Sequence, residues 1–309
     1  MSHFNKILVV ADPTVEEQKA LSRAFELAEK HPCKITLFLS IYDFSYEMTT
    51  MLSADERSSM KDAVINDRQK WLYELARTNG ADMDNITVKV DWHNRPYESI
   101  IKEAISGQYD LVVKGTHKHD VLKSVVFTPT DWHLLRKCPT AVLLVKDHAW
   151  PEHGKVLAAV NTGDMDDDHG NLNSGIIEHA SFMSRLLNSE THLINAFPPT
   201  PINIAVEIPD FDAIEYSSNL KAHHDKSLQE LASKFDINVN NLHLKEGMPE
   251  DVIPELAENM DAELVVMGTI GRTGISAALI GNTAEHVIDN INCDLLAIKP
   301  SDFETPIAV

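Results

Sequence analysis

Four of the chain's twelve glycines lie within fourteen residues, between positions 268 and 281. The apolar run Leu264–Met267 before them predicts a buried strand, and the pattern from Thr283 to Ile288 after them predicts the start of a helix. Glycine lets the backbone take positive φ and approach a ligand closely, and a helix N-terminus presents unpaired N–H donors at the positive end of its dipole. A loop of this kind can hold phosphate, so nucleotide binding is the first chemistry that these residues indicate.

The spacing of the glycines matches neither of two well-known phosphate loops. It is not Gly-x-Gly-x-x-Gly, and no Lys-Ser or Lys-Thr pair follows the last glycine. The alternative is a plain loop that ends in a helix cap. The residue pattern by itself leaves both interpretations open.

Length and composition favour an acidic protein of about two globular domains. The chain has 309 residues, 43% of them hydrophobic, and a formal net charge of −20. Loose binding to nucleic acid or to an anionic membrane relies on clustered Lys and Arg, so this charge argues against both. Apolar runs such as Ala141–Val145 are far shorter than the roughly 20 residues that span a bilayer. Because the sequence also shows no secretory signal, we expect a cytoplasmic protein.

The three cysteines, Cys33, Cys138 and Cys293, are far apart and have no Cys-x-x-Cys spacing. This usage fits reduced core thiols better than disulfides, and it assigns the cysteines no chemistry.

The two halves of the chain repeat each other. A shift of 153 residues carries Leu111–Val113 onto Leu264–Val266 without a gap, and near the start of each half a shift of 149 pairs Asp12 with Asn161. The insert at residues 163–170 helps to explain the change of register. We therefore expect two tandem domains, at residues 1–149 and 150–309.

Short apolar runs alternate with helical patterns in each half, which predicts two doubly wound α/β domains, each with a five-stranded parallel sheet. If the strand order is 3-2-1-4-5, the loops after the first and fourth strands face one crevice at the switch in strand order. The stretches 20–28, 64–75 and 100–105 have apolar residues at helical spacing. The ten predicted strands are Ile7–Ala11, Ile35–Tyr42, Ile86–Trp92, Leu111–Lys114, Ala141–Val145, Val156–Val160, His192–Phe197, Leu242–Lys245, Leu264–Met267 and Leu295–Ile298.

The chain resembles the universal stress proteins in their tandem two-domain form, over nearly its whole length. The segments that carry the resemblance are Lys6–Asp12, Tyr109–Thr116, Cys138–Val145 and Ala262–Thr269. It implies Rossmann-like domains, similar to the adenine-nucleotide α-hydrolase fold, that form an internal pseudo-dimer. It also implies a role in the stress response. Because the residues offer donors for phosphate but no base, we assign no catalytic residues and expect at most a slow ATPase activity.

ATP-binding members of this family carry Gly, two residues, Gly, nine residues, Gly and then Ser or Thr. Gly268, Gly271 and Gly281 keep this spacing, but Asn282 stands where Ser or Thr is usual and Thr283 follows one residue later. By resemblance, the first two glycines would lie against the ribose and the first phosphate. The last three residues of the pattern would donate to the outer phosphates of ATP or AMP, and Mg²⁺ could accompany ATP.

Asn161 stands where binding members generally have Asp at the end of the first strand. Its amide can still hydrogen-bond an adenine or ribose edge. In the first half, Lys118, Thr128 and Pro129 occupy the places of the second glycine, the third glycine and the residue after it. Proline removes a donor and side chains restrict close approach, so this half is similar to members that do not bind nucleotide.

Histidines offer candidate metal ligands. His117 and His119 could place two imidazoles near one ion, but a zinc site needs three or four ligands at fixed spacing, and no complete set is visible even with His223, His224 and His243. His133 and His286 occupy equivalent positions of the two halves, which favours a shared role in helix packing over catalysis.

Two further interpretations remain open. The chain could be a non-nucleotide carrier or scaffold in the stress response that binds zinc or an apolar ligand or partner, for which the apolar, proline-rich segment 197–211 is the candidate surface. It could also be an enzyme of the adenine-binding α/β group, although the Ser-Gly-Gly phosphate loop common there is missing. A further homodimer is open as well.

Overall fold

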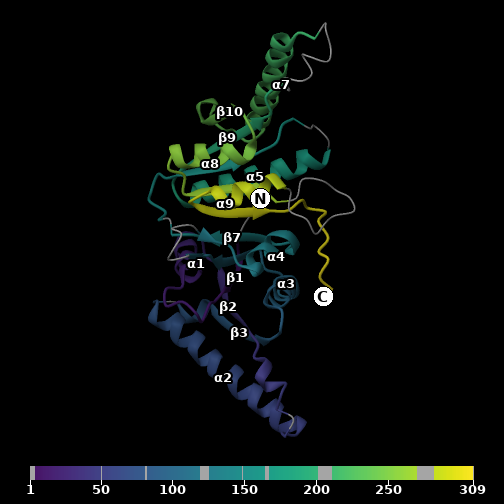
Figure 1. Ribbon diagram of the computed structural model, residues 1–309. Coiled ribbons are helices and arrows are strands. Elements are labelled where there is room, and N and C mark those ends of the chain that lie inside the picture. Colours follow the sequence, from purple (N-terminus) through teal and green to yellow (C-terminus); the bar gives the residue numbers. More distant parts are fainter. Residues whose placement is uncertain are drawn as a thin grey trace. The chain divides into compact units, whose positions relative to one another are not determined.

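The computed structural model describes residues 4–49, 51–80, 82–118, 125–147, 149–163, 167–200, 211–269 and 282–308. The chain divides into two compact units. The N-terminal unit comprises His3–Lys146 with Glu304–Val309, and the C-terminal unit is built on Asp147–Phe303. Strands and helices alternate along the chain in both units (Figure 1).

The N-terminal unit holds a parallel sheet in the order β3-β2-β1-β4-β7. Its strands are β1 Lys6–Val10, β2 Lys34–Ile41, β3 Ile86–Trp92, β4 Leu111–Gly115 and β7 Ala141–Val145. Its helices are α1 Lys19–Lys30, α2 Ala54–Thr78, α3 Pro96–Ser106 and α4 Pro129–Lys137, with 3-10 turns η1 Phe44–Tyr46 and η2 Met83–Asn85. After β4, a short antiparallel ribbon pairs β5 His117–Lys118 with β6 Val125–Val126.

The C-terminal unit repeats this order as β10-β9-β8-β11-β12. Its strands are β8 Lys155–Ala159, β9 Glu190–Phe197, β10 Leu242–Glu246, β11 Leu264–Gly268 and β12 Asp294–Ile298. Its helices are α5 Asp167–Leu186, α7 Ala213–Lys234, α8 Pro249–Asn259 and α9 Asn282–Asn290, with a 3-10 turn η3 Val239–Asn241 before β10.

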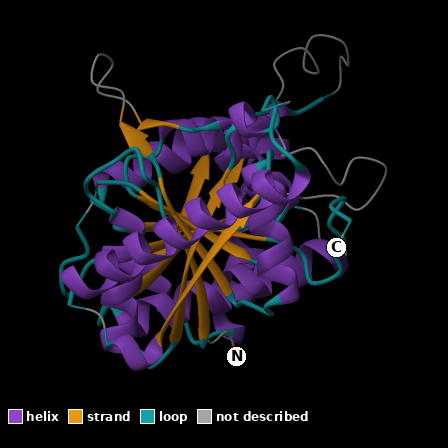
Figure 2. Ribbon diagram, turned by 90° about the horizontal axis from the view of Figure 1, so that it is seen from below, coloured by secondary structure: helices purple, strands orange, loops and turns teal. Residues whose placement is uncertain are grey.

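Helices cover both faces of the strands (Figure 2). The strand sequences explain this arrangement, because consecutive residues of a strand point to opposite faces and the central strands are apolar on both. Ile7, Leu8, Val265 and Val266 are all completely buried, although neighbours in the sequence face opposite helix layers. Continuous apolar strands therefore fix each sheet as the middle layer of three.

The predicted fold class is confirmed. All ten predicted strands are present, with ends shifted by at most two residues, and each unit has the strand order 3-2-1-4-5. The ribbon β5–β6 was not predicted, since two-residue strands carry no recognisable pattern. Among the helices that the structure describes, none combines the length and the apolar character that a membrane span requires.

The two equivalent histidines do not share one role. The ring of His133 stacks on Tyr97 with centroids 3.9 Å apart, which joins α4 to α3 as predicted. His286 is exposed on α9, so the packing role predicted for it is wrong. The cysteines are free thiols as predicted, Cys138 and Cys293 in the core and Cys33 half-buried, where burial raises its pKa to about 11.

Candidate functional site

The carboxyl ends of β8 and β11 meet at the switch in strand order of the C-terminal unit. The two strands are paired in parallel, with Ala159 opposite Met267. Gly268 ends β11 and Asn161 lies two residues beyond β8, so the fold brings these two predicted site residues to one edge of the sheet. Asn282 and Thr283 are the first two residues of α9. Gly271 and Gly281 lie outside the described residues.

Asn161 shapes the loop after β8. Its side-chain oxygen accepts a hydrogen bond from the Gly163 backbone N–H at 3.0 Å, which forms a tight Asx turn. Asn173 on α5 holds the same residue from the other side, since its amide donates to the Asn161 carbonyl at 2.7 Å and accepts from the Asn161 N–H at 3.1 Å. The loop is therefore clamped to the helix that follows it.

The N-terminal unit has the same turn and the same two-way amide contact after its first strand. The Asp12 carboxylate accepts from the N–H and hydroxyl of Thr14 at 2.9 and 2.6 Å, and the amide of Gln18 makes the same two-way clamp on the Asp12 backbone, at 2.6 and 3.0 Å. Because a carboxylate and an amide oxygen accept alike, Asn at position 161 preserves the turn. Sequence reasoning missed Gln18 and Asn173, because the insert at 163–170 hides their correspondence.

A buried polar chain supports the C-terminal loop from below. Asn195 on β9 accepts from the Thr162 N–H at 3.1 Å, and its amide lies 2.9 Å from Nδ1 of His224 on α7. His224 stacks on Phe197, with ring centroids 5.3 Å apart. Burial, with the nearby charge of His223, lowers the pKa of His224 and favours the neutral ring. The imidazole thus acts as a fixed hydrogen-bond partner.

Gly268 is required by packing. A Cβ at this position would lie 2.7 Å from Cδ2 of Leu172, a side chain of α5 that is itself buried. The equivalent Gly115 of the N-terminal unit has room, because the atom nearest to a Cβ there is the Ala20 nitrogen at 3.8 Å. The C-terminal unit therefore packs α5 more closely against Gly268 than the N-terminal unit packs α1 against Gly115.

A buried lysine lies beside Thr269, just after the end of β11. The Lys299 ammonium, in a residue that is 8% exposed, donates to the hydroxyl of Thr269, the residue that follows Gly268. It also lies 5.6 Å from the ring centre of Phe303. The repeat pattern pairs Lys299 with Lys146, but only the fold shows that the Lys299 ammonium lies beside Thr269. This cation can attract an anionic ligand to the loop.

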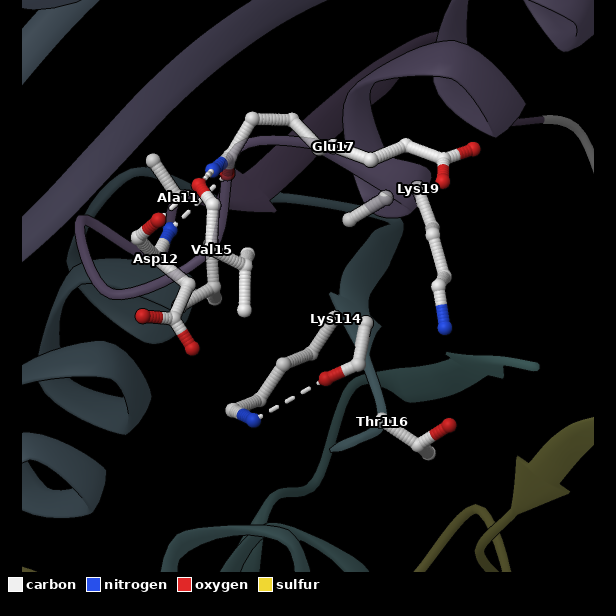
Figure 3. Close-up of a pocket in the computed structure, with 11 residues that line it drawn as sticks. Ala11, Asp12, Val15, Glu17, Lys19, Lys114 and Thr116 are labelled. Atoms are coloured by element: carbon white, nitrogen blue, oxygen red, sulfur yellow. Dashed lines mark hydrogen bonds between the residues drawn. The ribbon is translucent and has the colours of Figure 1, made fainter. Parts of the chain in front are cut away.

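The equivalent crevice of the N-terminal unit is a cavity of about 240 Å³ (Figure 3). Asp12 and Gln18 line one side, and Lys114, Gly115 and Thr116 line the other. Ligand sites for molecules of drug size commonly have volumes of about 300–1,000 Å³. The cavity is thus smaller than a nucleoside triphosphate site is expected to be.

An internal ion pair occupies the helix end beside this cavity. Lys114 Nζ lies 2.7 Å from Oδ1 of Asp131, whose residue is completely buried. The other carboxylate oxygen accepts from the backbone N–H and the hydroxyl of Thr128, at 2.7 and 2.8 Å, in a capping box. The C-terminal unit has Met267 and Ala284 at the two equivalent positions. In the N-terminal unit, the Asp131 carboxylate therefore occupies the N-terminal end of α4, where a helix would otherwise bind an anion.

The histidines assemble no metal centre that the described residues reveal. No group of three or more His, Cys, Asp or Glu side chains suited to a metal occurs among residues 4–308 outside the undescribed gaps. The backbone of His117 belongs to the ribbon after β4, and His119 lies outside the described residues. His243 instead pairs with His192, with Nε2 and Nδ1 3.1 Å apart.

The His192–His243 pair predicts an acid-sensitive C-terminal unit. Burial, and then the charge of His243, lowers the pKa of His192 from 6.5 to about 4, while Glu190 raises it slightly. Unfolded chains therefore take up a proton that folded His192 resists, so stability is lost as the pH falls from 6.5 towards 4, by about 2–3 kcal/mol. Denaturation of His192→Gln across this range should show a correspondingly smaller loss. His286→Gln, at an exposed histidine, should behave as the unchanged protein, and an equal loss in His192→Gln would refute the assignment.

Comparison with known proteins covers both halves of the chain. The sequence model of the Universal stress protein family matches residues 3–146 and 173–299. Universal stress protein E of Escherichia coli strain K12 is 50% identical over 308 residues, which are 99% of this chain and 98% of the relative. The Universal stress protein E homolog of Haemophilus influenzae is 42% identical over 304 residues, with 96% and 98% covered.

A solved structure shares this architecture. The crystal structure of a functionally unknown protein from Pseudomonas aeruginosa PAO1 matches with a TM-score of 0.75 and 31% sequence identity. The match covers 97% of this chain and 94% of that one.

Proposed function

Because the chain belongs to the universal stress protein family, we propose that it acts in the stress response by binding one adenine nucleotide, ATP or AMP, in its C-terminal unit. The six residues proposed to contact the nucleotide are Asn161, Gly268, Gly271, Gly281, Asn282 and Thr283. Gly268, Gly271 and Gly281 keep the spacing of the ATP-binding members of the family. The protein is proposed to work in the cytoplasm.

The proposal is supported above all by the position of Asn161, after β8, and Gly268, at the end of β11, at one switch point of the sheet. Asn161 is held by its own turn and by Asn173, and it shares a sheet edge with Gly268. A rigid loop loses little conformational freedom when ligand binds, which favours affinity. Lys299 adds a positive charge beside Thr269. A switch point with backbone donors and a cation suits an anionic ligand.

The N-terminal unit is proposed not to bind nucleotide. Its crevice has a volume of about 240 Å³, and the Asp131 carboxylate, paired with Lys114, already accepts a hydrogen bond from the Thr128 N–H at the end of α4 where a phosphate would bind. This difference between the units supports a stoichiometry of one nucleotide per chain.

The site is proposed to bind and not to turn over its ligand at an appreciable rate. Phosphate donors can be named, but the described residues around Asn161 and Gly268 offer amides, a lysine and neutral histidine rather than a carboxylate poised as a base. Mg²⁺ would accompany ATP as a counterion of its phosphates, and any hydrolysis would be slow.

Lys299→Met tests the position of the nucleotide. Methionine keeps the apolar stem but removes the charge, so we expect ATP affinity to fall about 10- to 100-fold, in keeping with the loss of one buried charged hydrogen bond. Isothermal titration with ATP and AMP measures the change, and AMP should lose less because it has fewer charges.

Lys146→Met is the matched control, because Lys146 is the equivalent lysine of the N-terminal unit, is 2% exposed and lies 5.1 Å from the ring centre of Phe127. It should leave ATP affinity unchanged. Equal losses in both variants would argue against a site in the C-terminal unit. No measurable nucleotide binding in the unchanged protein would favour a carrier or scaffold instead.

A further inference from the structure

A second cavity of the N-terminal unit lies at the carboxyl ends of β2 and β3. Helix α2 packs beside β3 (Figure 1). The volume of the cavity is about 660 Å³, within the range of about 300–1,000 Å³ that is common for small-molecule sites. Three aromatic residues, two carboxylates and one arginine are among its lining residues: Tyr42, Tyr46, Trp92, Asp43, Asp67 and Arg68.

The aromatic residues have the arrangement of a box. The ring of Trp92 lies 6.2 Å from the ring of Tyr42 and 5.2 Å from that of Tyr46, with interplanar angles of 63° and 71°. Both tyrosines thus stand steeply to the indole and form walls beside it. The faces of these rings carry negative electrostatic potential, which attracts cations.

The chain itself already places a cation beside the indole. Lys61 Nζ lies 5.4 Å from the ring centre of Trp92, within the distance at which such attraction is significant. The same ammonium pairs with Glu47 at 2.6 Å. The surroundings of Trp92 therefore tolerate positive charge.

The fixed charges of the lining favour a cation as well. Asp43 and Asp67 contribute two negative charges and Arg68 one positive charge, while Lys61 and Glu47 nearby balance each other. The Asp43 carboxylate accepts from the Ser45 N–H at 2.8 Å, and these hydrogen bonds lower its pKa and keep it ionised near neutral pH. An anion would meet net repulsion here.

We propose that this cavity binds a small quaternary ammonium compound, with the ammonium among Tyr42, Tyr46 and Trp92. A quaternary ammonium suits aromatic walls because it has no N–H groups that need acceptors, whereas a primary amine does. The proposal does not depend on nucleotide binding, because it rests on different residues in the other unit.

Choline is the probe, and its uncharged analogue 3,3-dimethyl-1-butanol is the matched control of the same shape. Titration of ¹⁵N-labelled protein, followed by the indole N–H resonance of Trp92 and assigned with Trp92→Phe, measures binding of both. We expect choline to move this resonance saturably, and the uncharged analogue to bind at least about 10-fold more weakly. Equal binding of the two compounds would show an apolar pocket and overturn the proposal.

Tyr46→Leu should weaken choline binding about 10-fold by removing one wall of the box. Tyr73→Leu is the control variant, because Tyr73 lies on α2 of the same unit, is 48% exposed and does not line the cavity. It should leave choline binding unchanged. No saturable shift up to about 0.1 M choline, or equal losses in both variants, would contradict the assignment. Choline binding should persist in Lys299→Met, which keeps this test separate from that of the nucleotide site.

Discussion

Asp131→Ala is expected to destabilise the N-terminal unit by about 3–5 kcal/mol, because it leaves the charge of Lys114 buried without its partner. The side chains of Lys114 and Asp131 are 9% and 0% exposed, so water can solvate neither of them well. The variant also loses the capping box with Thr128, which is worth about 1 kcal/mol. Urea denaturation followed by tryptophan fluorescence measures the effect, since three of the four tryptophans, Trp71, Trp92 and Trp132, belong to this unit.

The repeat supplies the control for this prediction. Lys114→Met combined with Asp131→Ala reproduces the Met267 and Ala284 of the C-terminal unit. Replacement of a buried ion pair by apolar residues is often neutral, so the double variant should recover most of the lost stability and retain only the capping loss of about 1 kcal/mol. If the double variant were as unstable as Asp131→Ala, the unpaired charge of Lys114 would not be the cause of the lost stability.

Gly281→Val is expected to weaken ATP binding at least about 100-fold, since a branched side chain would separate the backbone donors from the phosphates. The prediction rests on the family spacing, in which Gly281 directly precedes α9. Isothermal titration measures the loss, and circular dichroism checks that the variant is folded.

Thr128→Val is the matched variant, because Thr128 occupies the equivalent position before α4. It loses a helix cap, at a cost to stability of about 1 kcal/mol, and should keep full ATP affinity. If Thr128→Val lost ATP binding while Gly281→Val kept it, the nucleotide would belong to the N-terminal unit.

The fold could be predicted from the sequence because its determinants are local and repeated. Apolar runs such as Leu264–Met267 fix buried strands, and alternation with helical patterns fixes a parallel sheet. The duplication then tests each prediction twice. The strand order came from fold rules and was confirmed in both units.

Much of the site could not be predicted, since it depends on contacts between distant residues. The clamp of Asn173 on Asn161 and the support of the loop by Asn195 and His224 join residues of different elements. In the sequence, Lys299 could be recognised only as the equivalent of Lys146. Its position beside Thr269 follows from the pairing of β11 with β12. These contacts depend on the geometry of the side chains, which the periodicity of the sequence does not indicate.

The N-terminal unit shows the same limit. Pro129 and Thr128 indicated a poor phosphate loop, but only the fold shows that Asp131 and Lys114 fill its helix end with an ion pair. Thr128 followed three residues later by Asp131 resembles a capping box in the sequence and could have been recognised. The burial of the Lys114–Asp131 pair could not be recognised from the sequence.

Native mass spectrometry of the full chain with saturating Mg-ATP measures directly how many nucleotides each chain binds. We expect one nucleotide per chain, bound in the unchanged protein and lost in Gly281→Val. Two nucleotides per chain would contradict the difference proposed between the units. No nucleotide at all would contradict the proposed function.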